Sequence, residues 1–165
     1  MLSHVPKYKE VGVITVEELK GIGLIPPDER LRKGPVAIVE CPEEIPCNIC
    51  VDACPHKAIS MKTINDIPKV DWNKCTGCGI CVAKCPGLAI FVVDLSKPKK
   101  AYITLPYEFL PIPKVGNEVI LLNRYGKHVG KGKVVRIWEF NKTWAVVVEI
   151  PKKLAMEVRA IWVKR

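Results

Sequence analysis

The chain begins with the pattern of a short helix followed by a buried strand. In "ITVEELKGIGLIPP", Thr15 and Glu18 form a T-x-x-E capping box, and two glycines end the helical run. The apolar run "GPVAIVEC" then predicts a buried strand that leads to Cys41. We expect two further strands, one in "IPKVDWNKC" and one at residues 91–93.

The last third of the chain has a β pattern. "GNEVILLN", "GKGKVVRIWEF" and "TWAVVVEI" are rich in Val, Ile and Trp, and the turn-like segments "NRYGKHVGKG" and "FNKT" separate them. A short helix in "PKKLAMEV" and a last strand in "AIWVK" complete the pattern, which predicts a small β-barrel. We expect Trp138, Trp144 and Trp162 in its core. Four prolines predict that residues 95–114 are an extended connector with little regular structure.

Composition places the chain in a reducing compartment. No stretch approaches the ~20 apolar residues of a membrane span, and the N-terminus lacks the apolar region of a secretory signal. We therefore expect a cytoplasmic protein, in which eight cysteines favour metal binding over disulfides. The absence of Gln and the many Lys and Glu residues are typical of a thermophile.

The net charge of +9 is unevenly distributed. Residues 95–165 carry fifteen basic and five acidic side chains, whereas the two signs nearly balance before residue 95. Such an excess suits a phosphate backbone, an acidic partner subunit or a solvated lysine-rich face. The segment does not alternate aromatic and basic residues as a platform for single strands does, so we favour a protein partner or solvent over nucleic acid.

The cysteines form two related runs. The second has the spacing C-x2-C-x2-C-x3-C-P from Cys75 to Pro86. A shift of 31 residues places Cys47, Cys50, Cys54 and Pro55 on Cys78, Cys81, Cys85 and Pro86. The region is therefore an internal duplication.

This spacing indicates iron–sulfur chemistry. C-x2-C-x2-C wraps three thiolates around one cubane cluster, and the fourth cysteine, one helical turn further on, points to another cluster. Gly77 and Gly79 allow the backbone to approach the sulfurs closely. Structural zinc typically uses two separated pairs of ligands, which neither run shows. Apolar residues are expected to shield the clusters from water: Ile49, Val51, Ile59, Ile80, Val82 and Ile90.

Residues 41–94 resemble a bacterial-type ferredoxin with two [4Fe–4S] clusters. The resemblance implies two ligand sets. One cluster would take Cys54, Cys75, Cys78 and Cys81. The other would take Cys47, Cys50 and Cys85, and its fourth ligand is missing from the regular position.

That position holds Glu44, and the nearest cysteine, Cys41, lies three residues earlier. Either Cys41 reaches in over a longer loop, or Glu44 offers a carboxylate, or the cluster has three irons and no fourth ligand. A Cys41 without a metal role would be a buried free thiol. Because a thiolate is the better ligand for this soft site, and Pro42 and Pro46 are typical of a stiff bulging loop, we predict ligation by Cys41.

These patterns predict an α+β fold with four parts. Residues 1–40 would be an extension that packs on the cluster domain, residues 41–94 the two-cluster ferredoxin-like domain, residues 95–114 the connector, and residues 115–165 a small basic β-barrel.

The motifs favour electron transfer over catalysis. The sequence has no nucleotide-binding glycine motif, no P-loop and no zinc-protease motif. The wider flanks, including "LRKGPVAIVEC" and "EIPKKLAMEVRAIWV", resemble iron–sulfur subunits of flavin-dependent amine or imino-acid dehydrogenases, such as dye-linked proline or hydroxyproline dehydrogenase complexes. This resemblance implies that electrons leave a flavoprotein partner subunit, cross both clusters and reach an acceptor protein or quinone. The alternatives are a free soluble ferredoxin and a nucleic-acid-binding iron–sulfur protein.

Overall fold

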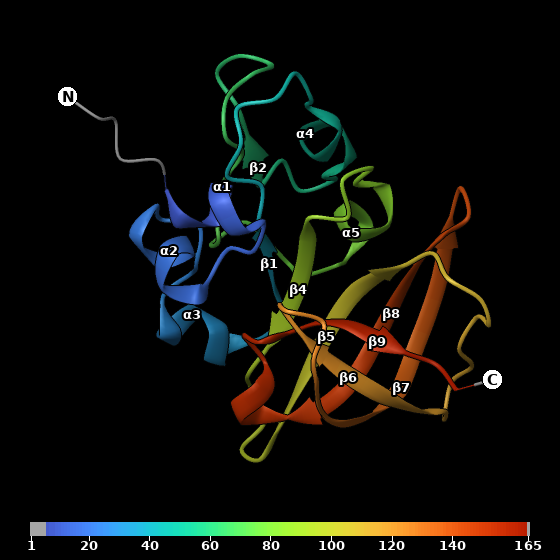
Figure 1. The fold of residues 1–165 in the computed structure, drawn as a ribbon. Helices are drawn as coiled ribbons and strands as arrows, with labels where there is room; N and C mark the ends of the chain where they lie inside the picture. The colour runs from blue at the N-terminus through green and yellow to red at the C-terminus, as the bar shows by residue number, and fades with distance from the viewer. Residues whose placement is uncertain (1–5, 165) are drawn as a thin grey trace.

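A seven-stranded antiparallel sheet forms the centre of the computed structural model, which describes residues 6–164 (Figure 1). The strand order is β1-β4-β5-β8-β7-β6-β9. The strands are β1 Val36–Val39, β4 Ile90–Asp94, β5 Lys100–Tyr107, β6 Glu118–Asn123, β7 His128–Phe140, β8 Thr143–Pro151 and β9 Val158–Trp162. Two short strands, β2 Ile59–Ser60 and β3 Lys69–Val70, pair separately.

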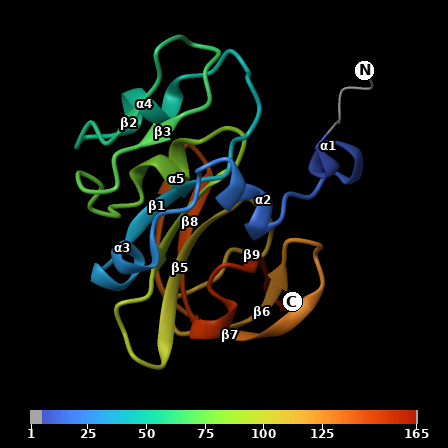
Figure 2. The same cartoon turned by 90° about the vertical axis from the view of Figure 1, so that its left-hand side faces the viewer.

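The helices are all short. They are α1 Lys7–Val11, α2 Val16–Gly21, α3 Asp28–Lys33, α4 Ile49–Ala53, α5 Ile80–Lys84 and the 3₁₀ turn η1 Lys152–Leu154. The predicted capping box starts α2, because Glu18 N donates to Thr15 Oγ1 at 3.2 Å and Thr15 N donates to the Glu18 carboxylate at 2.9 Å. Figure 2 shows α3 beside β1 at one edge of the sheet.

The predicted fold class is wrong. The chain does not divide into an α+β ferredoxin-like fold and a separate β-barrel, because the C-terminal strands continue the sheet that contains β1 and β4. β9 lies against β5, yet among residues 6–164 no ladder joins these two strands, so the sheet stays open. β5 makes the connection by pairing with β4 on one side and with β8 on the other.

The expected connector is also wrong over residues 100–107, which form β5. The side chains of this strand alternate, and those of Ala101, Ile103 and Leu105 are fully buried. Pro106 lies opposite Ala145 of β8 without ending the strand. The prolines therefore masked a period-two pattern that indicated a strand. The boundaries proposed for the other parts of the chain stay predictions.

β1 and β4 bury side chains on both faces of the sheet. Val36 and Ile38 join the larger core, which the C-terminal strands share, whereas Ala37 and Val39 join a smaller core under α4 and α5. The residues of β4 alternate between the same two cores. This double burial explains the uninterrupted apolar runs "VAIV" and "IFVV".

Most of the other elements agree with the sequence pattern. β6, β7, β8 and β9 form where strands were predicted, and η1 forms within "PKKLAMEV". The tryptophans do not all lie in a core. Trp138 and Trp144 are half-buried against the cores, and Trp162 is 59% exposed, so the prediction is wrong for Trp162.

Candidate iron–sulfur sites

The eight cysteines gather into two groups of four. Cys41, Cys47, Cys50 and Cys85 line one hollow, which we call the first site. Cys54, Cys75, Cys78 and Cys81 line another, the second site. The structure thus brings together the residues of each ligand set proposed from the sequence, and ligation of iron by these thiols stays a prediction.

Two helices connect the sites. Cys50 in α4 belongs to the first site, whereas Cys54, at the end of α4, belongs to the second. In α5 the order is reversed, with Cys81 in the second site and Cys85 in the first. Each helix therefore spans the distance between the sites within about one turn.

The strand pairs around the helices follow the same duplication. β1 pairs with β4 through Val39 opposite Ile90, and β2 pairs with β3 through Ile59 opposite Val70. A shift of 31 residues places Val39 on Val70 and Ile59 on Ile90, so β1 corresponds to β3 and β2 corresponds to β4. The internal repeat read from the sequence is therefore a structural repeat.

Backbone N–H groups point at three of the sulfurs. Ala58 N donates to Cys54 Sγ at 3.3 Å, and its counterpart in the repeat, Ala89 N, donates to Cys85 Sγ at 3.5 Å. Ala37 N of β1 donates to Cys75 Sγ at 3.3 Å. Such bonds favour thiolates and tune the potential of a bound cluster.

Burial disfavours ionisation of the thiols when no cation is present. It raises the pKa of Cys50 to about 11 and that of Cys81 to about 12, and it also raises the pKa of Cys41. Neighbouring cysteines of the same site raise these pKa values further. Four crowded thiols therefore need a cationic group to become thiolates together, which fits a metal cluster.

The donor set suits a four-iron cluster better than a single ion. Within residues 6–164, no three Cys, His, Asp or Glu side chains converge closely enough to hold one metal ion. In a cubane cluster each thiolate binds a different iron, so the four sulfurs surround the cluster without meeting at one point. Two sets of four soft ligands fit this group.

The structure separates Cys41 from Glu44. Cys41 is half-buried and lines the same hollow as the other cysteines of the first site. Glu44 is exposed and lines a different hollow with Ser60 and Lys62. This placement favours Cys41 as the fourth ligand.

The predicted apolar shield is partly wrong. Ile59, Val82 and Ile90 are buried, and Val51 is half-buried. Ile49 and Ile80, at the first positions of α4 and α5, are 43% and 36% exposed. The first residues of these two helices face solvent, so Ile49 and Ile80 do not form part of the apolar shield.

One family comparison gave a match. Residues 45–102 match the model of the 4Fe-4S dicluster domain. This segment is a ferredoxin-type domain. It contains seven of the eight cysteines, and Cys41 precedes it. Together with the eight cysteines, this match supports a 4Fe–4S electron-transfer protein. Comparisons with curated proteins and with solved structures gave no match.

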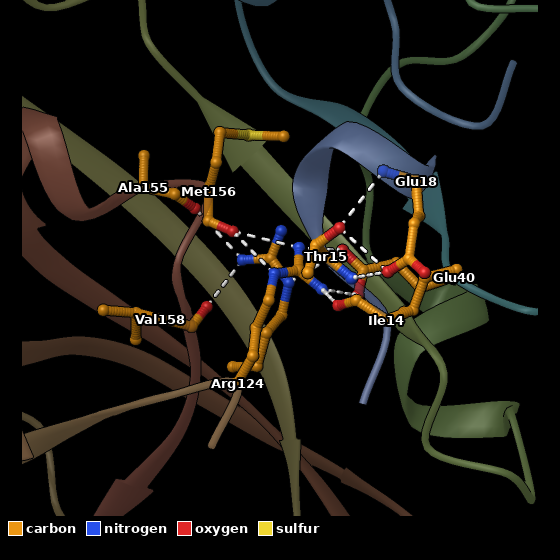
Figure 3. A network of polar contacts seen from close by, with 9 residues as sticks. Ile14, Thr15, Glu18, Glu40, Arg124, Ala155, Met156 and Val158 are labelled. Carbon is orange, nitrogen blue, oxygen red and sulfur yellow. Dashed lines mark hydrogen bonds and ion pairs between the residues drawn. The ribbon is translucent and has the colours of Figure 1, made fainter. Parts of the chain in front are cut away.

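Four charged residues outside residues 45–102 hold the chain segments next to Cys41 and Cys75, and sequence reasoning missed them: Arg30, Glu40, Arg124 and Arg159. Arg30 of α3 donates to the carbonyl oxygen of Cys75 at 2.7 Å. Glu40, directly before Cys41, binds Arg124 and Arg159 (Figure 3). No motif marks these residues, because their partners lie 45 to 119 positions away in the chain.

Proposed function

We propose that this chain is the electron-transfer subunit of a multi-subunit flavin-dependent dehydrogenase and has no catalytic site of its own. Its two [4Fe–4S] clusters would carry electrons between a flavin in a partner subunit and an acceptor. The observation that carries the proposal is the sharing of α4 and α5 between the two sites. One helical turn separates the ligands of one cluster from those of the other, so the path between the clusters is short.

The flanks support a subunit rather than a free ferredoxin. A free carrier needs only the cluster-binding segment, whereas here β4 of the ferredoxin-type domain continues through β5 into the C-terminal strands. The cluster-binding segment and the C-terminal strands therefore share one sheet, and a free carrier would not need these additional strands. The resemblance of the flanks to subunits of dye-linked dehydrogenases supports the same choice.

The charges on the C-terminal strands suit a protein partner better than a nucleic acid. A hollow there is lined by Lys99, Lys100, Lys131 and Lys133 together with two glutamates. Lys100 pairs with Glu149 at 2.6 Å, and Lys131 pairs with Glu118 at 2.7 Å. These pairs neutralise part of the positive charge that a phosphate backbone would need. Among the described residues, no helix is long and apolar enough to cross a membrane.

An anaerobic native pull-down with this chain as bait tests the proposal. We expect a flavoprotein to co-purify in a fixed ratio, and we expect the clusters to become reduced when the flavin of that complex is reduced. A monomeric chain that carries both clusters and retains no flavoprotein would instead support the free ferredoxin. Tight binding of random oligonucleotides with a steep salt dependence would favour the nucleic-acid alternative.

A further inference from the structure

Arg30, in α3 of the N-terminal part of the chain, forms hydrogen bonds with the loop of the second site. Its Nε donates to Trp72 O at 2.7 Å, and its Nη2 donates to Cys75 O at 2.7 Å and to Pro35 O at 3.1 Å. Its Nη1 donates to Gly34 O at 3.1 Å. All four acceptors are peptide carbonyls. One guanidinium therefore links residues 34–35, which precede β1, to residues 72–75, which lead into the second site.

Two arginines from the C-terminal part of the chain hold the loop of the first site by binding Glu40, the residue before Cys41. Arg124 binds the Glu40 carboxylate with two parallel bonds of 2.7 and 2.8 Å, and Arg159 Nε adds a third at 2.8 Å. The side chains of all three residues are 5–7% exposed. The backbone N–H of Glu40 donates to Ala89 O at 2.8 Å. Both the backbone and the side chain of the residue before Cys41 are therefore fixed.

The two arginines are themselves held in place. Arg124 donates to Met156 O and to Ile14 O, and Arg159 donates to Ala155 O and to Val158 O (Figure 3). The Arg159 guanidinium also lies 4.8 Å from the centre of the Phe91 ring in β4. Burial lowers the pKa of Arg159 to about 10, and the Glu40 carboxylate opposes this shift, so the guanidinium stays charged at neutral pH.

We propose that Arg30 is a positioning residue for the second cluster, and that Arg124 and Arg159, acting through Glu40, are positioning residues for the first. This inference rests on the proposed ligand sets, in which Cys41 is the earliest member of the first set and Cys75 begins the C-x2-C-x2-C run of the second. The first site needs the stronger anchor, because Cys41 enters over a loop with more residues than the regular spacing has. None of these four residues lies within residues 45–102. The flanks would therefore hold in place two cysteine loops that the ferredoxin-type domain alone does not fix.

The supports also supply charge. Two guanidiniums and one carboxylate leave a net positive charge beside the first loop, and Arg30 places another beside the second. Positive charge stabilises a cluster after it has gained an electron and so raises its reduction potential. Each arginine should therefore influence mainly the potential of its own cluster.

The test compares Arg159→Met with Arg30→Met. Redox titration followed by EPR gives the potential of each cluster, and Cys47→Ser and Cys78→Ser assign the signals to the first and second site. We expect Arg159→Met to lower the potential and the occupancy of the first cluster and to leave the second unchanged. Arg30→Met should do the reverse. Glu149→Gln, whose ion pair with Lys100 lies outside both hollows, should change neither.

Conservative variants separate position from charge. Lysine keeps the charge but cannot form the planar set of bonds, so Arg159→Lys and Arg30→Lys should lower occupancy with a smaller change in potential. If Arg159→Met fails to fold, Arg159→Lys, which keeps a positive charge beside Glu40, becomes the test of occupancy and should still lower the occupancy of the first cluster only. Equal effects on both clusters, or no effect on either, would overturn the inference. An unmodified chain that assembles no pair of four-iron clusters would overturn the proposed function as well.

Discussion

The loop that leads into α5 at the second site contains two glycines with a left-handed backbone, Gly77 (φ 67°) and Gly79 (φ 79°). Their counterparts at the first site, 31 residues earlier, are Pro46 and Asn48, and Asn48 has a φ of −128°. A Cβ atom on Gly77 would lie 2.5 Å from Pro35, and one on Gly79 would lie 2.7 Å from the Trp138 ring. The second loop therefore has no room for side chains at positions where the first loop carries them.

The duplicated halves thus keep the helices and the N–H···S bonds but position their loops differently. The second loop is regular in spacing, pressed between its neighbours, and tied down by bonds from one guanidinium to peptide carbonyls. The first is irregular in spacing, and a buried cluster of charged side chains holds its start. Both loops are therefore held by residues outside residues 45–102, but the irregular first loop is held by a buried ion cluster and the regular second loop by bonds to peptide carbonyls.

The largest expected effect is at Cys41. Two four-iron clusters require about eight irons per chain. Cys41→Ala should drop to about seven irons with a three-iron cluster, or to about four if the first cluster is lost. Glu44→Ala should keep about eight, because Glu44 is exposed and outside the first site. Anaerobic iron analysis, with EPR of the oxidised and reduced states, measures both variants.

The reverse result would change the comparison between the sites. If Cys41→Ala keeps two intact clusters and Glu44→Ala loses one, Glu44 is the ligand, and the regular spacing matters more than the thiolate. Zinc in place of iron, or half of the expected iron in the unmodified chain, would contradict the two-cluster assignment itself.

A smaller effect is expected from Gly79→Ala. The left-handed backbone costs an alanine about 1–2 kcal/mol, and the contact with the Trp138 ring adds to that cost. The free energy of unfolding, measured with denaturant, should fall, and the second cluster should be lost before the first. Asn48→Ala is the matched control at the first site and should be nearly neutral, because its φ is negative.

Trp138 offers a second arm of the same experiment. A smaller ring in Trp138→Phe should relieve the contact, so that Gly79→Ala costs less in the double variant than in the unmodified background. Equal costs in both backgrounds would show that the backbone conformation alone makes the glycine necessary.

Local spacing was sufficient to predict the cysteine groups, whereas the overall sheet was not predictable in the same way. The repeat places Cys54 and Cys85 by one helical turn, which is short-range geometry. β5 was missed because the four prolines of residues 95–114 indicated a connector, and without β5 the C-terminal strands were expected to close on themselves. Arg30 and Glu40 were missed because their roles depend on partners brought close only by the complete fold.

A small effect is expected at the capping box of Thr15 and Glu18. This box lies next to Arg124, which supports the first site, so a change there tests the first site separately from the second. Ile14, whose carbonyl accepts from Arg124, directly precedes the cap residue Thr15 (Figure 3). Thr15→Ala removes the acceptor for Glu18 N and should lower the free energy of unfolding by about 1 kcal/mol. Neither the occupancy nor the potential of the second cluster should change, because the bonds of Arg30 do not involve α2.

Acidification should weaken the same helix. Hydrogen bonds from Thr15 hold the pKa of Glu18 below its ordinary value, so the carboxylate contributes stability above that value and loses it as the pH falls through the lowered pKa. Glu18→Gln should flatten this part of the pH profile and should leave Thr15→Ala with a smaller additional cost than it has in the unmodified chain. Thermal unfolding at a series of pH values measures both effects. An unchanged acid limb in Glu18→Gln would show that other carboxylates set the acid sensitivity.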